Sequence, residues 1–519
     1  MKPAIALWLL IALCSIPGFA AANSPLADAV MKRDTETLRS LLQVKADVNI
    51  AQADGTTALH WAAQWDDAET ARALIRAGAN PRAANRAGAT PLFLATVNGS
   101  AALIEILLNA GADPNEPVLS HGEMPLMMAA RTGKPDAVKV LLDHGALVNA
   151  AENLRGTTAL MWAAEQNHAD VVQLLADRGA DMSARSTPLR LIKRGGLGFA
   201  RLGRDGKIPL DDPIGGLTAL LFAAREGALE SARVLLAKGA DVNHASVDGS
   251  TPLLVAVQNG HYEAAQLLLD HGANPNLANG KGWTPLYLAV KNRNQETTAI
   301  PGPRTDGVLD FIKVLLDRGA NPNLRIKEET EVHQGMTALW LKEQGATPLL
   351  RAALCGDLIV VRLLMGHGAD PLISTFDHTS PLMVAAGVGW ADGMTHENSE
   401  GETLELVKLL VDAGGKINEA NDHGITALHG AAYKGANKVV QFLADRGADL
   451  AAKDKGEDFG FGASSVPLTP LNWAEGVPIG MSSAIYHPTT VALLERLMQE
   501  RGIPVIHNTF HGQKSDDGR

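Results

Sequence analysis

The chain has 519 residues, and its 57 aspartate and glutamate residues outnumber its 46 lysine and arginine residues, so its formal net charge at pH 7 is −11. This charge argues against a general binder of nucleic acid or of anionic membranes, because contacts to phosphate need an excess of cations. The length alone would allow three or four globular domains. The internal repeats of the sequence indicate one repetitive domain instead.

The N-terminus has the features of a secretory signal peptide. A short positive start precedes the apolar run Ala4–Ile16 and the small residues Ala20-Ala21-Ala22. We therefore predict that residues 1–22 are a signal peptide and that the mature protein is exported, to a bacterial periplasm or to the medium; a buried N-terminal helix is the alternative. Cleavage would remove Cys14, which leaves Cys355 without an intramolecular disulfide partner and favours a buried, inert thiol.

The next segment, residues 24–49, predicts two amphipathic helices that lack the motif of the later repeats. Lys45 stands where the later units place a glycine. We interpret this segment as an N-terminal cap, because the end units of a repeat stack must present a polar outer face. No later stretch is apolar for long enough to form a membrane helix, so we expect no membrane insertion.

A seven-residue motif recurs from residue 57 onward, as in TALHWAA, TPLFLAT and TPLLVAV, with a spacing of 33 residues between several copies. Most copies lead into a second apolar helix that ends at a glycine, as in ARVLLAKGADVN. The copies begin at Thr57, Thr90, Met124, Thr158, Thr218, Thr251, Thr284, Thr347, Ser380, Thr426 and Thr469. This pattern resembles the ankyrin repeat, whose signature is T-P-L-H-x-A at that period.

The resemblance implies an all-α repeat solenoid of about twelve units including caps, each a helix-turn-helix followed by a β-hairpin finger. The residues themselves support helix pairs. A Thr or Ser before Pro or Ala caps the first helix, two alanines give it a narrow face, and glycine ends the second helix in a left-handed turn. Each unit leaves apolar faces that only stacking can cover.

The solenoid is predicted over residues 23–505 as a single domain, followed by a disordered tail over 506–519. Insertions interrupt the period in two kinds of place. Those before the next first helix would lengthen fingers, and those between the two helices of a unit would lie on the far edge. The first kind covers 182–214, 325–345 and 451–467, and the second covers 292–307, 387–403 and 476–487.

The first long insertion is cationic and rich in glycine, which is unusual in so acidic a chain. We predict that it overhangs the concave face and that its cations bind acidic groups of a partner, since arginine pairs well with carboxylates. The predicted contacts are Arg190, Lys193, Arg194, Arg201 and Arg204. The alternative is a loop that is fastened to carboxylates of the solenoid itself.

The fifth position of the motif is apolar in nine of eleven copies. In ankyrin folds this position faces the groove, so the resemblance predicts an exposed apolar stripe that a partner would cover. The stripe consists of Trp61, Leu94, Met128, Trp162, Phe222, Val255, Leu288, Arg351, Val384, Gly430 and Trp473. We expect Trp61, Met128, Trp162, Phe222, Leu288 and Arg351 to bind the partner. The alternative is that neighbouring units and long fingers cover the stripe, which would then extend the core.

We identify no catalytic, cofactor or metal motif. Gly280-Lys281 lacks the rest of a phosphate loop, and His396-Glu397 lacks the second histidine of a zinc helix. His60 and His429 occupy the histidine of the repeat signature and should bond the backbone of the adjacent finger. The sequence therefore predicts an exported, non-catalytic scaffold that binds a protein with acidic and apolar surface. A binder of a small apolar or acidic ligand, in a pocket between groove and fingers, is the alternative.

Overall fold

The computed structural model describes residues 24–118, 121–189, 213–294, 306–328, 341–390, 397–456, 466–477 and 485–507. Three predictions from the sequence fall outside these residues. They are the signal peptide over 1–22, the cations of the first long insertion, and nearly all of the tail over 506–519. The cations in question are Arg190, Lys193, Arg194, Arg201 and Arg204.

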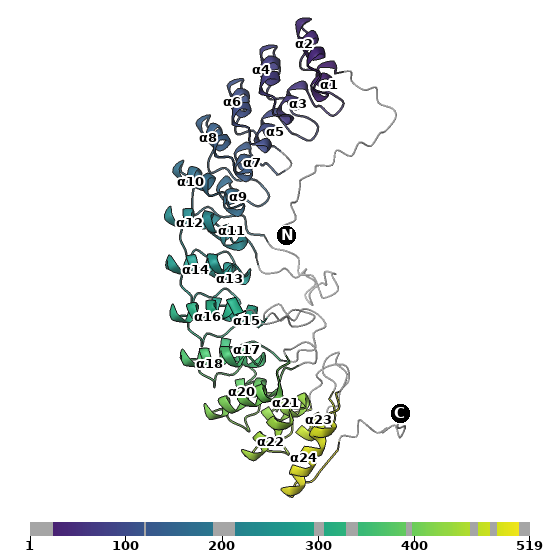
Figure 1. The fold of residues 1–519 in the computed structure, drawn as a ribbon, viewed down its shortest axis with the longest axis vertical. Helices are drawn as coiled ribbons and strands as arrows, with labels where there is room; N and C mark the ends of the chain where they lie inside the picture. Colours follow the sequence, from purple (N-terminus) through teal and green to yellow (C-terminus); the bar gives the residue numbers. More distant parts are fainter. Residues whose placement is uncertain are drawn as a thin grey trace, which may run out of the picture. The chain divides into compact units, whose positions relative to one another are not determined.

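Twenty-four α-helices form in the described part of the chain, which confirms the prediction of twelve helix pairs (Figure 1). The first ten are α1 (Pro25–Met31), α2 (Thr35–Gln43), α3 (Ala58–Gln64), α4 (Ala68–Arg76), α5 (Pro91–Asn98), α6 (Ala101–Asn109), α7 (Pro125–Thr132), α8 (Pro135–Asp143), α9 (Ala159–Glu165) and α10 (Ala169–Asp177). The others are α11 (Ala219–Glu226), α12 (Leu229–Ala237), α13 (Pro252–Gln258), α14 (Tyr262–Asp270), α15 (Pro285–Asn294), α16 (Asp306–Asp317), α17 (Pro348–Leu354), α18 (Leu358–Gly366), α19 (Pro381–Ala386), α20 (Glu400–Asp412), α21 (Ala427–Lys434), α22 (Asn437–Asp445), α23 (Pro470–Ala474) and α24 (Pro488–Glu500).

The chain divides into two compact units. Unit 1 comprises Met1–Ala163 and Asp170–Asp181, and unit 2 comprises Ala164–Ala169 and Met182–Arg519. In unit 1 the odd-numbered helices α1, α3, α5 and α7 pack successively against one another, and in unit 2 the helices α11 to α23 do the same. Within each unit the even-numbered helices form a second row beside the odd-numbered ones (Figure 1). We call the odd-numbered helices the inner row and the even-numbered helices the outer row.

The inner helices begin at capped residues, as the motif predicts. Thr90 accepts a hydrogen bond from the Phe93 N–H and is followed by a proline, which needs no backbone partner at that position. In α3, the backbone N–H of Thr57 donates to His60 Nδ1 over 3.1 Å. Such caps stabilise a helix by about 1 kcal/mol each, so the repeated threonine sets the start of each unit.

The histidines of the signature are structural, as predicted. His60 Nε2 lies 3.0 Å from the carbonyl oxygen of Ala89, and His429 Nε2 lies 3.2 Å from that of Leu468. Both imidazoles are fully buried. They join the start of an inner helix to the finger of the next unit, where each adds a second hydrogen bond to a carbonyl that already accepts from a backbone N–H of that finger.

The outer helices end in left-handed turns that an asparagine ties together. Gly145 has a φ of 86°, and its carbonyl oxygen accepts a hydrogen bond of 3.0 Å from Asn115 of the preceding unit. The amide oxygen of Asn115 in turn accepts from the Leu147 N–H over 2.8 Å. In unit 2, Asn323 bonds Gly368 and Asp370 in the same way. The N-terminal cap keeps the turn without the glycine, because Lys45 adopts a φ of 54°.

We use the term finger for the segment between an outer helix and the next inner helix. Within the described residues the fingers form no strand, only four isolated antiparallel bridges, one of which pairs Leu189 with Ile214. Single backbone hydrogen bonds link neighbouring fingers, for example from Arg86 N to Asp54 O over 2.8 Å in unit 1. In unit 2 the Gly280 N–H donates to Asp248 O over 2.7 Å. Neighbouring fingers therefore brace each other without a sheet.

Candidate partner-binding surface

The fifth motif position forms a column of residues along the inner row, and we call these the column residues. In unit 1 the column is half-open. Trp61, Leu94 and Trp162 are partly exposed, whereas Met128 is only 7% exposed. Met128 packs with Ala89, Phe93 and Val118 in an apolar cluster that Leu94 and Trp162 border. The predicted apolar stripe is thus present in unit 1, with its middle methionine in the core.

In unit 2 most of the column is closed. Phe222 is 7% exposed, Leu288 2% and Arg351 0%, and Val384 and Trp473 are buried as well. Only Val255 remains partly exposed. The prediction that Met128, Phe222, Leu288 and Arg351 face an open groove is therefore wrong as to their exposure. Whether the column residues bind a partner stays a prediction.

The polar column residues are held by acceptors that the fingers supply. In unit 1, Trp61 Nε1 donates to Gln52 Oε1 over 2.8 Å, and Trp162 Nε1 donates to Thr157 Oγ1 over 2.7 Å. The Thr157 hydroxyl in turn donates to Glu152 Oε1 over 2.9 Å. Each indole is thus fixed by the finger that precedes its own helix.

In unit 2, finger residues also bond the polar column residues, and here the bonded groups include buried charges. Arg351 forms an ion pair with Glu343, and both side chains are only 1% exposed. Trp473 Nε1 donates to Asp454 Oδ2 over 2.7 Å. Both carboxylates lie in insertions predicted from the sequence, 325–345 and 451–467. A buried charge is tolerated only when it is paired, so Glu343 and Asp454 lie against these column residues and satisfy their polar groups. This corresponds to the alternative interpretation of the stripe.

Two cations border the aromatic column residues. The Arg131 guanidinium lies 5.2 Å from the centroid of the Trp162 ring in unit 1. In unit 2, Arg225 lies 4.9 Å from the ring of Phe222 and pairs with Glu165 over 2.6 Å. An arginine over an aromatic face contributes about 0.5–1 kcal/mol at exposed sites. Each arginine partly covers the ring beside it.

The root of the cationic finger lies within the described residues, although its five predicted contacts do not. Leu189 and Ile214 exchange two backbone hydrogen bonds of 2.8 Å, and the Val247 N–H donates to Gly215 O over 3.1 Å. The side chains of Leu189, Ile214 and Val247 are exposed, with Ile214 at 48%. Beside them Arg185 Nε donates to His244 Nε2 over 2.7 Å. The two described ends of this finger are therefore paired and expose apolar side chains, and we call them its root.

Sequence reasoning missed Trp65, which lies one turn after Trp61 and is 39% exposed. The two rings stack with their centroids 5.9 Å apart, and Arg33 lies over the Trp65 ring at 4.6 Å. The spacing of four residues on one helix was the available signal. The carboxylates of Glu343 and Asp454 were missed too, because nothing in the motif marks a finger residue as a partner of the column.

Two pockets lie away from the column and fingers. One, of about 400 Å³, lies between the first two helix pairs of unit 1 beside Trp65. The other, of about 470 Å³, lies across the outer helices α12, α14 and α16 of unit 2. Among the described residues, no group of three histidine, cysteine or acidic side chains could hold a metal ion. No helix in that part of the chain is long and apolar enough to cross a membrane.

Known proteins share short stretches with this chain. It is similar to the E3 ubiquitin-protein ligase KEG of Arabidopsis thaliana, with 29% identity over 102 residues that make up 20% of this chain and 6% of that protein. It is also similar to the palmitoyltransferase AKR1 of Lachancea kluyveri, with 31% identity over 147 residues, or 28% of this chain and 17% of that protein. The chain thus spans less than a fifth of the length of either relative. The crystal structure of the human ASB11 ankyrin repeat domain aligns with 49% of this chain and 99% of that domain, at 25% identity and a TM-score of 0.39.

Family models match much more of the chain. The model described as ankyrin repeats in three copies matches residues 26–118, 115–186, 203–279, 220–300 and 394–454. The model for a single ankyrin repeat matches residues 281–327 and 344–376. These matches cover well over half of the sequence and coincide with helix pairs in both units. The chain belongs to the family of ankyrin-repeat proteins.

Proposed function

We propose that this protein is an exported, non-catalytic scaffold that binds a partner protein on its inner row. Ankyrin repeats generally mediate protein–protein interaction through such surfaces. The observation that carries the proposal is the half-open column of unit 1, where Trp61, Leu94 and Trp162 leave aromatic and apolar surface accessible. Large aromatic side chains of this kind anchor interfaces, because each removes a large apolar area from water.

The cationic finger supplies the second part of the proposal. Its five cations, Arg190, Lys193, Arg194, Arg201 and Arg204, would pair with carboxylates of the partner, while the exposed root at Leu189 and Ile214 would cover apolar surface. Arginine suits this role because its planar guanidinium binds a carboxylate through two hydrogen bonds. The expected partner therefore combines acidic and apolar surface.

Truncation of Trp162 tests the inner-row site. The mature protein captures its partner from the exported fraction of its own cells, and the affinity of the purified pair is then measured by calorimetry. Trp162→Ala should weaken binding at least ~30-fold, as loss of an interface anchor does. Val97→Ala removes an exposed apolar side chain that is not in the column and serves as the matched control. Equal affinities of the wild type and Trp162→Ala would refute inner-row binding.

Export is tested separately. The signal-peptide pattern of residues 1–22 supports it, and the mature chain should begin near Ala21 or Asn23. N-terminal sequencing of the protein recovered outside the cytoplasm gives this boundary directly. An intact Met1 on a protein confined to the cytoplasm would contradict export while leaving the binding proposal standing.

A further inference from the structure

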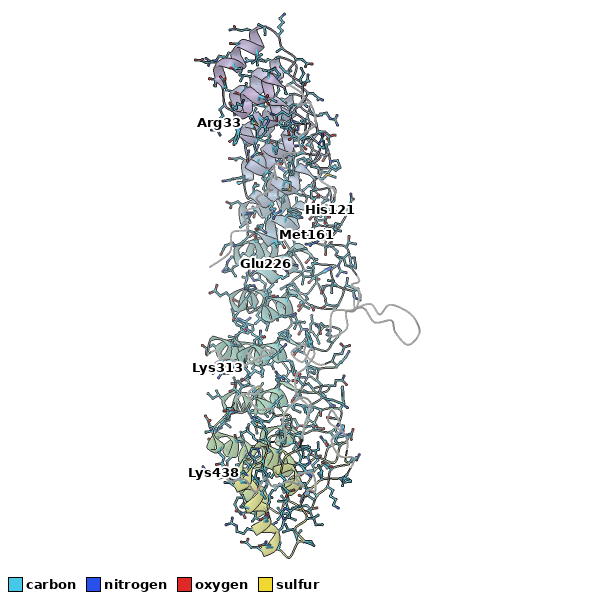
Figure 2. The ribbon with its side chains drawn as sticks, turned by 90° about the vertical axis from the view of Figure 1, so that its right-hand side faces the viewer. Arg33, His121, Met161, Glu226, Lys313 and Lys438 are labelled. Atoms are coloured by element: carbon cyan, nitrogen blue, oxygen red, sulfur yellow. The ribbon has the colours of Figure 1, made fainter. Side chains whose placement is uncertain are left out.

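An aromatic and cationic stack marks the first two helix pairs of unit 1. Arg33, in the turn between α1 and α2, lies over Trp65, which stacks on Trp61 at an interplanar angle of 23°. Trp65 nevertheless keeps more than a third of its surface exposed. Figure 2 shows Arg33 at one edge of unit 1, whereas His121 of a finger lies at the opposite edge. Trp61, at one end of the stack, is bonded to Gln52 of a finger, whereas Arg33, at the other end, lies on the edge away from His121.

A pocket of about 400 Å³ adjoins this stack, between the two helix pairs. Its apolar wall comes from Ala29, Val30, Leu38 and Trp65. The volume lies within the range of sites that hold a ligand or one large side chain. An exposed tryptophan beside such a pocket is surface that an association would cover favourably.

Carboxylates dominate the polar rim of the pocket. Asp34 accepts hydrogen bonds from the N–H and hydroxyl of Thr37, and Asp67 accepts the same pair from Thr70. The bonds from Thr37 hold the pKa of Asp34 below its ordinary value, so this carboxylate is charged at neutral pH. The carboxylate of the third, Asp66, makes no hydrogen bond or ion pair to a described residue, although its backbone N–H donates to Ala63 O over 3.2 Å. Arg33 is the only cation in the lining, and its guanidinium rests on Trp65.

Arg33 and Asp66 also adopt a backbone conformation that favours glycine. Their φ angles are 55° and 54°, and the corresponding turns of the next two units contain Gly99 at 68° and Gly133 at 67°. A residue with a side chain is strained in the left-handed conformation, though aspartate less than most residues. The chain thus keeps two charged residues in the lining of this pocket at positions where glycine would be less strained.

We propose that the pocket between the first two helix pairs binds a segment of the partner protein that carries a lysine or arginine next to an apolar side chain. This inference rests on the proposed function and gives the partner a second, chemically distinct contact. The apolar side chain would pack against Val30, Leu38 and Trp65. The partner's cation would lie at Asp66, the carboxylate that lacks another partner.

Charge complementarity selects a cation over an anion. An anionic group in this pocket would meet three carboxylates and one guanidinium that already contacts an aromatic face. A cation instead is attracted by three carboxylates and repelled by Arg33 in the lining and by Lys32, whose charge acts on Asp34, so the balance of charge in the pocket still favours a cation. Like charges brought together at an interface cost several kcal/mol, so an acidic segment should be rejected here even though the cationic finger would favour it elsewhere.

The test uses the full mature chain and two short synthetic peptides, one of alternating lysine and leucine and one of alternating glutamate and leucine. The indole N–H signal of Trp65 is assigned by its loss in Trp65→Phe and followed by NMR during titration. Peptide affinity is measured in parallel by fluorescence anisotropy. We expect the lysine peptide to shift the Trp65 signal to saturation and the glutamate peptide to leave it unchanged.

Asp66→Asn removes the charge but keeps a residue that tolerates a left-handed turn, so the fold should be preserved. It should lower the affinity for the lysine peptide by up to about fivefold, which is the contribution of an exposed ion pair. Trp65→Ala should weaken it at least ~30-fold. Asp136→Asn, an exposed acid in the first turn of α8, changes the net charge equally and should have no such effect.

Two results would overturn the inference. One is a Trp65 indole signal that the lysine peptide does not shift. The other is an Asp136→Asn variant that binds the lysine peptide as weakly as Asp66→Asn does, which would show that the binding depends on net charge alone. The proposed function fails independently of both. It would be refuted if Trp162→Ala bound the partner protein as tightly as the wild type does. If Trp65→Ala bound the partner with unaltered affinity, only the second contact would be refuted.

Discussion

Arg351 occupies a column position that a partner-binding surface would leave exposed, yet it is fully buried against Glu343. Tyr287 adds a contact of 3.5 Å from its hydroxyl to Glu343 Oε2. A buried ion pair is weak evidence for stability as such, but each partner depends strongly on the other. The pair therefore holds the end of this finger against the helix that it leads into.

Removal of one member should be costly. Glu343→Ala leaves the Arg351 guanidinium buried without its carboxylate and is expected to lower the free energy of unfolding of unit 2 by about 3–5 kcal/mol. Denaturant unfolding followed by circular dichroism measures the change. Glu230→Gln breaks an exposed pair with Arg233 in the same unit and should change stability by less than about 1 kcal/mol. Similar effects of the two variants would show that Glu343 is not a buried anchor.

His429 shows the consequence of burying a titratable signature residue. Burial lowers the pKa of this imidazole from 6.5 to about 4. The unfolded chain therefore binds a proton as the pH falls below 6.5, whereas the folded chain remains neutral. The contribution of His429 to stability is complete above pH 6.5 and is lost progressively as the pH falls toward 4.

A variant from the chain itself tests this pH dependence. In the last unit Asn472 replaces the histidine, and its amide oxygen accepts from Thr469 N over 3.1 Å. His429→Asn should keep this cap and remove the titration. The fall in stability of the wild type between pH 6.5 and 4 should exceed that of the variant by on the order of 3 kcal/mol. Parallel stability curves for the two proteins would show that His429 does not titrate in this range.

At the scale of the elements, the helix pairs could be predicted from the sequence. Which column residues the fingers bury could not. The caps at Thr90 and Thr218 and the left-handed turn at Gly145 each follow from local chemistry repeated at a fixed period. The finger acceptors have no fixed spacing. Gln52 precedes its tryptophan by 9 residues, Glu343 precedes its arginine by 8, and Asp454 precedes its tryptophan by 19. The period of the motif therefore indicates on which side of its helix a residue lies. Whether that residue is exposed depends on the fingers, whose acceptors follow no fixed spacing.

The root of the cationic finger provides a test at this scale. Gly215 has a φ of 106°, and a Cβ there would lie 2.7 Å from the backbone oxygen of Thr187. Gly215→Ala should destabilise unit 2 by more than the ~1–2 kcal/mol that a left-handed alanine alone costs. Gly239→Ala is the matched control, because its φ is 86° and a Cβ there meets nothing within 4 Å. Equal melting temperatures of the two variants would show that the backbone at the finger root adjusts to the added Cβ without strain.

At the scale of the whole molecule, charge is unevenly distributed in a chain whose net charge is −11. The rim of the first pocket in unit 1 is acidic, whereas the residues between Leu189 and Ile214 include six lysines and arginines against three aspartates. Stability in a repeat stack is a sum of contacts between neighbours, so such charges can serve binding without disturbing distant units. A partner with both signs of charge would be oriented by this distribution as well as attracted.

Reversal of the finger charges separates binding from structure. The variant replaces Arg190, Lys193, Arg194, Arg201 and Arg204 by glutamate. Partner affinity should fall, and its dependence on salt should flatten, because screened attractions between the finger and acidic groups have been removed. Affinities measured by calorimetry at low and high salt test both effects, and reversal of the exposed Lys139, Arg233 and Lys313 on outer helices is the control. Unchanged affinity with a lower melting temperature would show instead that the finger is clamped to carboxylates of its own stack.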